Sequence, residues 1–171
     1  EDELGKAVNA GQRPGQQKLQ VPRGGEKKAG WSLGLKRNLA CHLASGEVIA
    51  HFDDDDLYAD LYLDVMCQKL VEAAKGSTSK PALVTLGAWH MLDLSDQTFG
   101  FFDPANDPLI DYAMRQPLQY GYGFTYVYTR AAWQSLPFAD VEWSEDGNFT
   151  SGLWEKGFAV NLVSPSALKA A

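Results

Sequence analysis

Hydrophobic and polar positions along the chain change their spacing several times, and each change predicts a new structural element. Residues 1–30 show no sustained periodicity and are rich in Gly, Gln, Lys and Pro, which predicts a polar loop or mobile arm. Residues 31–171 are predicted to form the folded core. The expected helices cover Gly34–Ala44, Asp60–Lys75, Arg130–Ser135 and Ser144–Gly157. The expected strands cover Glu47–Phe52, Ala82–Leu92, Thr98–Phe102, Phe124–Thr129 and Phe158–Val163, with Thr98–Phe102 as a hairpin partner or a short edge strand.

The faces and ends of these helices can be specified further. In the first helix, three leucines recur on one face and Ser32 is placed to cap the N-terminus. In the second, Asp60 caps the start and Gly76 ends the helix. The apolar faces consist of Leu35, Leu39 and Leu43 in the first helix and Leu63, Met66, Leu70 and Ala74 in the second. Asp103–Pro117 holds three of the eight prolines, which predicts a loop with one helical turn around Leu109–Met114.

Helices and strands alternate at first and then mix, which predicts an α/β fold with a mixed, mainly parallel sheet flanked by helices. Hydrophobic residues make up 45% of the chain and charged residues 22%, as in ordinary globular domains. No apolar run approaches the roughly 20 residues that a membrane span needs. We therefore expect a soluble domain, cytoplasmic or peripheral to a membrane, without a transmembrane segment. Cys41 and Cys67 fall in predicted helices and are expected to be free thiols.

The charge is unevenly distributed along the chain. Residues 1–38 hold eight Lys and Arg against four Asp and Glu, whereas the remainder holds seven against eighteen. A nucleic-acid-binding domain would present a basic folded surface, so this class of partner is not expected. A basic segment beside an acidic body instead suits a small ligand that carries phosphate.

Four consecutive aspartates, Asp53 to Asp56, directly follow the predicted strand Glu47–Phe52. In open α/β folds the carboxyl end of a strand is where ligands bind. Side chains alternate in an extended segment, so Asp53 and Asp55 are expected to point one way and Asp54 and Asp56 the other. Mg²⁺ and Mn²⁺ prefer such oxygen ligands and often share them with substrate phosphates. The run therefore predicts a divalent-cation site.

The alternative for this run is a solvated acidic turn in which Asp56 or Asp60 caps the next helix. Two other known sites are excluded by Leu57. It occupies the third ligand position of an EF-hand loop, and no glycine follows at the sixth. It also occupies the threonine position that a haloacid-dehalogenase-like phosphatase requires.

Two further charged pairs lie at predicted helix starts. Lys36 and Arg37, in the first turn of one helix, would bind an anion together with the helix N-terminus, or would simply extend into water. Glu145 and Asp146 open another helix, where the helix dipole favours negative charge and Ser144 is placed to cap. On residue type alone, helix stability explains the second pair well, and catalysis is the alternative.

The segment "GLKRNLACHLASGEVIAHFDDDDLYADLYL" resembles the central part of family 2 glycosyltransferases of the GT-A (Rossmann-like) fold. The resemblance lies in a basic-Asn pair, an Ala-x-Gly-Glu turn, a strand ending in Asp-x-Asp-Asp and a Tyr-Leu helix. It covers about residues 34–160 and includes a Glu-Asp pair about ninety residues after the Asp-x-Asp motif.

This resemblance implies a role for each motif. Asp53 and Asp55 would hold Mn²⁺ or Mg²⁺, and Asp53 and Asp54 would lie at the nucleotide-sugar donor. Arg37, with Lys36 as the second choice, would contact the donor diphosphate. Asp146 would be the catalytic base and Glu145 would orient the acceptor. The implied reaction is an inverting transfer from a UDP- or GDP-sugar to a hydroxyl of a sugar, lipid or protein acceptor.

Two parts of the family pattern are absent from this chain. Only Glu1–Leu4 precedes the polar loop where the family has further strands, so the resemblance implies a core truncated at its N-terminus. The family also often has a metal-binding histidine after the Glu-Asp pair, and no histidine follows Asp146 here. The alternatives are therefore a non-catalytic metal- or carbohydrate-binding relative on the same scaffold and a metal-dependent phosphoryl-transfer enzyme.

Aromatic residues and histidines complete the candidate chemistry. Tyr120, Tyr122 and Trp143 are candidates for stacking on a sugar ring. The remaining aromatics of interest and the histidines are expected to be buried in the core. These are Phe124, Tyr126, Tyr128, Trp89, Trp133, Trp154, His42, His51 and His90.

Overall fold

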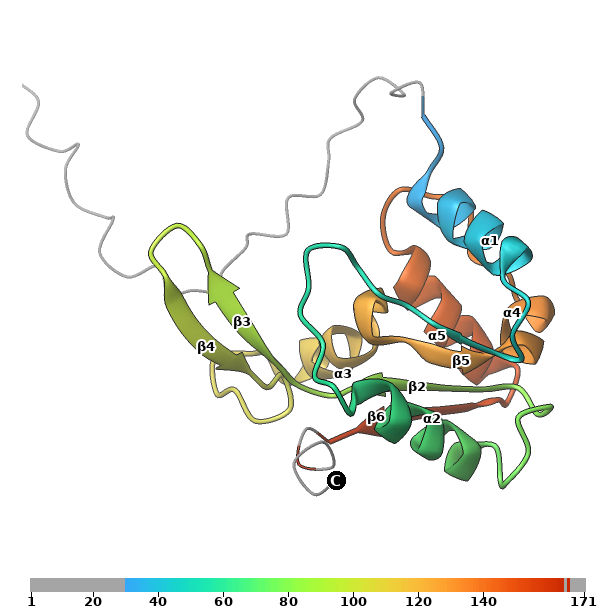
Figure 1. Ribbon diagram of the computed structural model, residues 1–171. Coiled ribbons are helices and arrows are strands. Elements are labelled where there is room, and N and C mark those ends of the chain that lie inside the picture. Colours follow the sequence, from blue (N-terminus) through green and yellow to red (C-terminus); the bar gives the residue numbers. More distant parts are fainter. Residues whose placement is uncertain (1–29, 165, 167–171) are drawn as a thin grey trace, which may run out of the picture.

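The computed structural model describes residues 30–164 and residue 166, and Figure 1 shows the arrangement of their elements. The arm predicted over residues 1–30 lies outside the described residues except for Gly30. The helices are α1 (Leu33–Leu43), α2 (Tyr62–Ala73), α3 (Tyr112–Tyr120), the 3₁₀ helix η1 (Gly123–Thr125), α4 (Arg130–Ser135) and α5 (Glu145–Glu155). The strands are β1 (Val48–Ala50), β2 (Ala82–Leu86), β3 (Trp89–Asp93), β4 (Thr98–Phe102), β5 (Val127–Thr129) and β6 (Ala159–Val163).

The main sheet has the strand order β1-β5-β2-β6 and is mixed. β2 and β6 pair in parallel, whereas β5 runs antiparallel to both β1 and β2. The expected α/β fold with a mixed sheet between helices is confirmed. The expectation of a mainly parallel sheet is wrong, because β5 is inserted between two strands that both run in the opposite direction.

Helices cover both faces of this sheet, and each face has its own core (Figure 1). On one face, α2 packs over β2 and β5, and its Met66 and Leu70 share a buried cluster with Val84 and Val127. On the other face, α1, α4 and α5 surround a core that includes Tyr128. Successive residues of β5 point to opposite faces, as the pleat of a strand requires. The burial of Tyr126 and Tyr128 predicted from the sequence is confirmed.

The predicted strand Ala82–Leu92 divides into two strands that belong to different sheets. β2 ends at Leu86, and the amide of Gly87 donates to the carbonyl of Val163 at 3.0 Å. After this point β3 leaves the main sheet and pairs with β4 as an antiparallel hairpin, with Trp89 opposite Phe102. Thr98–Phe102 is therefore the hairpin partner, and Figure 1 shows this hairpin projecting from the main sheet.

Helix α1 faces the sheet with residues other than those we predicted. Ser32 caps it as expected, accepting from the Leu35 amide at 3.1 Å. However, Leu35, Leu39 and Leu43 are exposed, Leu43 to 74%, and the buried positions are Gly34 and Cys41. The small residues face inward because Gly34 contacts the backbone of Ala139 and donates to the carbonyl of Val141.

Helix α2 confirms most of its predicted face. Met66, Leu70 and Ala74 are buried, whereas Leu63 is exposed and Tyr62 is buried in its place. The hydroxyl of Tyr62 donates to the carbonyl of Thr125 at 3.0 Å, which gives this buried aromatic its polar partner. The cap predicted at Asp60 is wrong, because the helix begins after Leu61 without a side-chain cap. Gly76 ends the helix with a positive φ of 79°, as predicted.

Three other local predictions are corrected. The single turn expected around Leu109–Met114 is the nine-residue helix α3, whose cap Asp111 accepts from Ala113 and which tolerates Pro117 on its solvent-exposed surface. The predicted strand start Phe124 belongs to η1. Ser144 stands at the start of α5 but makes no side-chain cap, because its backbone is left-handed with φ 64°.

The thiols and the helix lengths of the described residues can be compared with the expectations from composition. Cys41 and Cys67 are free and lie within α1 and α2, as predicted; Cys41 is buried and Cys67 only partly so. Among the residues that the structure describes, no helix has the length and apolar character required to cross a bilayer.

Candidate functional site

Asp53 to Asp56 form a turn just beyond β1 rather than an extended segment. The amide of Asp56 faces the carbonyl of Asp53 at 3.4 Å across this turn. Asp53, Asp55 and Asp56 each place one carboxylate oxygen within 4.8 Å of the others. The expected alternation is therefore wrong for Asp56, which joins Asp53 and Asp55, while Asp54 stays outside the group. Four consecutive polar residues after a strand favour a β-turn. This signal in the sequence would have predicted that Asp56 lies beside Asp53 and Asp55.

The three carboxylates are exposed, yet their electrostatics are unfavourable. Partial burial raises the pKa of Asp53, the Arg37 guanidinium opposes that rise, and the charges of Asp55, Asp54 and Asp146 add to it. Burial followed by the charges of Asp55 and Asp53 likewise raises the pKa of Asp56. Asp53 and Asp56 therefore ionise less readily than a free carboxyl group does. A bound cation would relieve this repulsion.

Tyr58 fastens the aspartate turn to the 3₁₀ helix η1. Its hydroxyl oxygen accepts from the backbone amide of Asp53 at 3.1 Å. The same hydroxyl donates to the carbonyl of Phe124 at 2.9 Å. One phenol thus connects the start of the aspartate turn to the segment between α3 and β5.

Arg37 is paired with Glu145 in the interior. Its Nη2 lies 3.3 Å from Oε1 of Glu145, and the two side chains are only 13% and 3% exposed. The guanidinium carbon also lies 5.7 Å from the ring centre of Phe138. Burial raises the pKa of Glu145, and so does the charge of Asp146, whereas Arg37 lowers it. The structure therefore brings together one residue from each predicted charged pair, α1 supplying the cation and α5 the anion.

One nitrogen of Arg37 remains without a partner. Its Nη1 is buried and makes no hydrogen bond among the described residues. It lies so close to Gly123 that a Cβ added there would stand 1.9 Å away. Lys36, the other member of the predicted basic pair, is exposed and lines the groove described below.

Asp146 lies in the first turn of α5 and is held by backbone amides at both oxygens. Its Oδ2 accepts from the amide of Gly123 at 3.0 Å, and its Oδ1 accepts from the amide of Gly147 at 2.7 Å. Each carboxylate oxygen has two lone pairs, so both can still accept another hydrogen bond. Asp146 thus has a defined orientation and remaining capacity to accept a proton.

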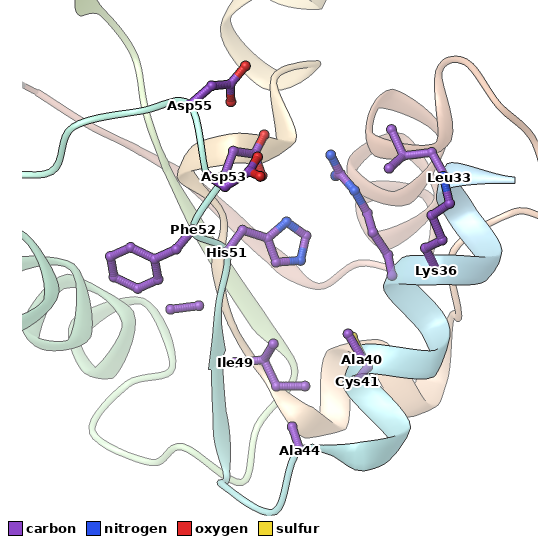
Figure 2. Close-up of a pocket in the computed structure, with 13 residues that line it drawn as sticks. Leu33, Lys36, Ala40, Cys41, Ala44, Ile49, His51, Phe52, Asp53 and Asp55 are labelled. Atoms are coloured by element: carbon purple, nitrogen blue, oxygen red, sulfur yellow. The ribbon is translucent and has the colours of Figure 1, made fainter. Parts of the chain in front are cut away.

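An open groove of about 600 Å³ separates α1 from β1 and the aspartate turn. Figure 2 shows Ala40, Cys41 and Ala44 on the α1 side and Asp53 and Asp55 at the upper end of the view. Of the predicted site residues, Lys36, Arg37, Asp53, Asp54 and Asp55 line this groove. Glu145 and Asp146 do not line it, but adjoin it through Arg37 and Gly123.

The predicted sugar-stacking residues have different environments. Trp143 is 70% exposed, two residues before Glu145. Tyr122 packs at 4.9 Å between ring centres against Trp89, and burial together with the Asp146 charge raises its pKa. Tyr120 packs against Trp154, with 4.4 Å between their ring centres, and Trp154 is more exposed than predicted.

The three histidines also differ. His42 and His90 are exposed, so the prediction that they are buried is wrong for both. His51 is partly buried and both of its ring nitrogens are hydrogen-bonded.

Comparisons of this chain with protein-family models, with curated proteins and with solved structures find no match. The function therefore has to be argued from the geometry of the site.

Proposed function

We propose that this chain carries a metal-dependent, inverting glycosyltransferase site that moves a sugar from a UDP- or GDP-sugar to an acceptor hydroxyl on a GT-A-like scaffold. The observation that carries this proposal is the shared anchoring of the two acidic groups. Asp53 is connected to Phe124 through Tyr58, and Asp146 accepts from the neighbouring residue, Gly123. Two acidic groups far apart in sequence thus flank one short segment.

The aspartate turn fits a hard divalent cation. Asp53, Asp55 and Asp56 offer three carboxylate oxygens from one turn, which is the donor type that Mg²⁺ and Mn²⁺ prefer. Their exposure leaves room for water and phosphate oxygens to complete the shell. When bound, the cation would neutralise the negative charge of the donor diphosphate.

The chain's own residues supply binding and proton transfer in this proposal. Lys36 and Arg37 lie near the N-terminus of α1, which would also attract the diphosphate. Asp146 accepts the proton of the acceptor hydroxyl as that oxygen attacks the anomeric carbon. The bond from this carbon to the diphosphate breaks in the same step, with inversion and without a covalent intermediate. Glu145 keeps Arg37 in place, and exposed Trp143 offers a face to the acceptor.

The test separates catalysis from binding. Asp146→Asn should lower transfer by at least about 100-fold, because it removes the general base. Calorimetry of the same variant with UDP- and GDP-sugars, with and without Mn²⁺, should show unchanged metal-dependent binding. Asp64→Asn, at an exposed position in the first turn of α2, is the matched control and should retain transfer. Loss of donor binding in Asp146→Asn would instead make Asp146 a structural residue.

A second candidate is a non-catalytic metal- or carbohydrate-binding site. The observation in its favour is that Glu145 already neutralises Arg37, which leaves this guanidinium less available to a diphosphate. Mn²⁺ binding without any nucleotide-sugar binding would support this candidate. Nucleotide hydrolysis without an acceptor would support a phosphoryl-transfer enzyme instead.

A further inference from the structure

His51 lies at the end of β1, between the aspartate turn and the core, and it contacts two different elements. Its Nδ1 lies 2.8 Å from the carbonyl oxygen of Gly123 in η1. Its Nε2 lies 2.9 Å from the hydroxyl of Tyr128 in β5. Figure 2 shows the His51 ring on the opposite side of the strand from the Phe52 ring, near the base of Asp53.

The direction of these hydrogen bonds follows from the chemistry of their partners. A backbone carbonyl only accepts, so Nδ1 of His51 must carry a proton and donate to Gly123. Both ring nitrogens of the partly buried His51 contact uncharged groups, a carbonyl and a hydroxyl, so neither contact provides an anion that would stabilise a charged imidazolium. In a neutral imidazole with Nδ1 protonated, Nε2 is an acceptor, and the Tyr128 hydroxyl therefore donates to it.

The series of hydrogen bonds continues beyond Tyr128 to Cys41. Because the Tyr128 hydroxyl donates its hydrogen bond to His51, its oxygen can accept a hydrogen bond from the thiol of Cys41, 3.1 Å away. Burial raises the pKa of Cys41, which keeps this thiol protonated. A directed series of hydrogen bonds thus runs from Cys41 through Tyr128 and His51 to the carbonyl of Gly123.

Gly123 connects this series of hydrogen bonds to Asp146. Its carbonyl accepts from His51, while its amide donates to Oδ2 of Asp146 at 3.0 Å. The two contacts constrain the peptide groups before and after the Cα of Gly123. Arg37 fills the space beside the Cα, which removes further freedom.

We propose that His51, as the Nδ1-protonated tautomer, is a positioning residue that orients the Asp146 carboxylate through the Gly123 residue. Its catalytic consequence rests on the proposed function, whereas the orientation of Asp146 does not. The competing interpretation is that His51 merely fills space between β1 and β5, where its ring also packs edge-on against Tyr128.

Three substitutions separate these interpretations. The Asn side chain carries its amide nitrogen on Cγ, as His carries Nδ1, so His51→Asn can still donate to Gly123. His51→Gln extends its amide to about the place of Nε2 and can reach only Tyr128. His51→Phe keeps the ring and loses both hydrogen bonds. A positioning role predicts that Asn preserves the geometry of Asp146, whereas Gln and Phe lose it.

The primary measurement is the amide resonance of Gly123 in two-dimensional ¹H–¹⁵N spectra of the full chain. This resonance should lie downfield and move upfield in Asp146→Asn, because its acceptor changes from a carboxylate to an amide. His51→Gln and His51→Phe should produce a similar upfield movement, and His51→Asn should not. A Gly123 resonance that is the same in all three His51 variants would overturn the proposal, as would Asn behaving like Gln. If His51→Phe does not fold, the Asn and Gln pair decides.

The second measurement is transfer activity with a UDP- or GDP-sugar and Mn²⁺. His51→Gln should lower kcat by about 10- to 100-fold with the donor KM unchanged, since a small misplacement of a catalytic group has costs of this size. His51→Asn should retain most of the kcat of the unmodified chain. Absence of transfer and of donor binding in the unmodified chain would refute the proposed function, while the Gly123 resonance would still decide whether His51 orients Asp146.

Discussion

Among the single residues of the site, Gly123 contacts three of the others. Its amide donates to Asp146, its carbonyl accepts from His51, and its Cα faces Nη1 of Arg37, which has no hydrogen-bond partner among the described residues. Any side chain at this position requires the guanidinium of Arg37, which pairs with Glu145, to shift. Glycine is required here by close approach of a side chain rather than by backbone conformation.

We predict that Gly123→Ala lowers the free energy of unfolding by about 1–3 kcal/mol, the usual cost of overpacking. The added Cβ would stand 1.9 Å from Nη1 of Arg37, so the guanidinium has to move. Gly147→Ala is the control, because nothing lies within 4 Å of a Cβ there and alanine favours the helix. Urea unfolding should show a loss for the first variant and none for the second. Equal stabilities would mean that Arg37 relaxes without cost.

His51 should make stability depend on pH in a definite direction. Burial and the charge of Arg37 lower the pKa of His51 from 6.5, its ordinary value, to about 4 in the folded chain. Between pH 4 and pH 6.5 the unfolded chain therefore binds the proton more readily than the folded chain does. Stability is therefore complete above about pH 6.5 and falls as the pH drops towards 4, by at most about 3 kcal/mol.

This prediction is checked by urea unfolding between pH 4 and 8 with a metal chelator present. His51→Asn cannot titrate, so its stability should fall less than that of the unmodified chain over the same interval. Because the other titrating groups are common to both proteins, the difference between the two curves isolates His51. Parallel curves would show that His51 titrates equally in the folded and unfolded states.

At the scale of elements, α1 shows how backbone contact overrides an apolar pattern. Its three leucines are spaced for a buried face, yet Gly34 determines which side of the helix meets the protein. Only a residue without a side chain allows the helix backbone to approach Ala139 and to donate to Val141. The leucines are consequently turned towards solvent in the described part of the chain.

We predict that Gly34→Ala destabilises the chain by more than about 2 kcal/mol. The new Cβ would lie 1.8 Å from the carbonyl oxygen of Ala139, and a backbone atom cannot move aside as a flexible side chain can. Gly100→Ala, in the open β3–β4 hairpin, meets nothing within 4 Å and serves as the control. Thermal unfolding should show a lower Tm for the first variant alone. An unchanged Tm would mean that α1 can shift as a unit.

At the scale of the whole molecule, the site is assembled from segments at many points along the chain. α1 provides Arg37, the turn after β1 provides the aspartates, η1 provides Gly123 and α5 provides Asp146. Because these segments meet only in the folded state, a ligand held by the aspartate turn should stabilise the entire fold by mass action.

We predict that Mn²⁺ raises the Tm of the chain. A free concentration about 100 times the dissociation constant corresponds to about 2.7 kcal/mol, or about 5–10 °C for a domain of this size. Asp55→Asn should remove most of this increase, since Asp55 belongs to the three-carboxylate group. Asp96→Asn, in the distant hairpin turn, should retain it. A Tm that does not respond to Mn²⁺ would contradict cation binding at the aspartate turn.

The local elements and the candidate chemical groups could be predicted from the sequence. Helical spacing and β-rich runs placed most helices and strands close to their observed bounds, because these signals depend on neighbouring residues. The α/β class followed from their order. Asp53, Asp55, Glu145 and Asp146 were identified as candidates from residue type and position, and their proposed roles remain predictions.

Tertiary packing sets how these parts meet. It inserted β5 antiparallel between β1 and β2, turned the leucines of α1 outward and brought Asp56 beside Asp53 and Asp55. It also paired Arg37 with Glu145 and linked His51 to Asp146 through Gly123. These contacts join residues up to about a hundred positions apart and depend on close packing and on single backbone atoms. No periodicity or spacing within the sequence records such contacts, because they exist only when the chain has folded.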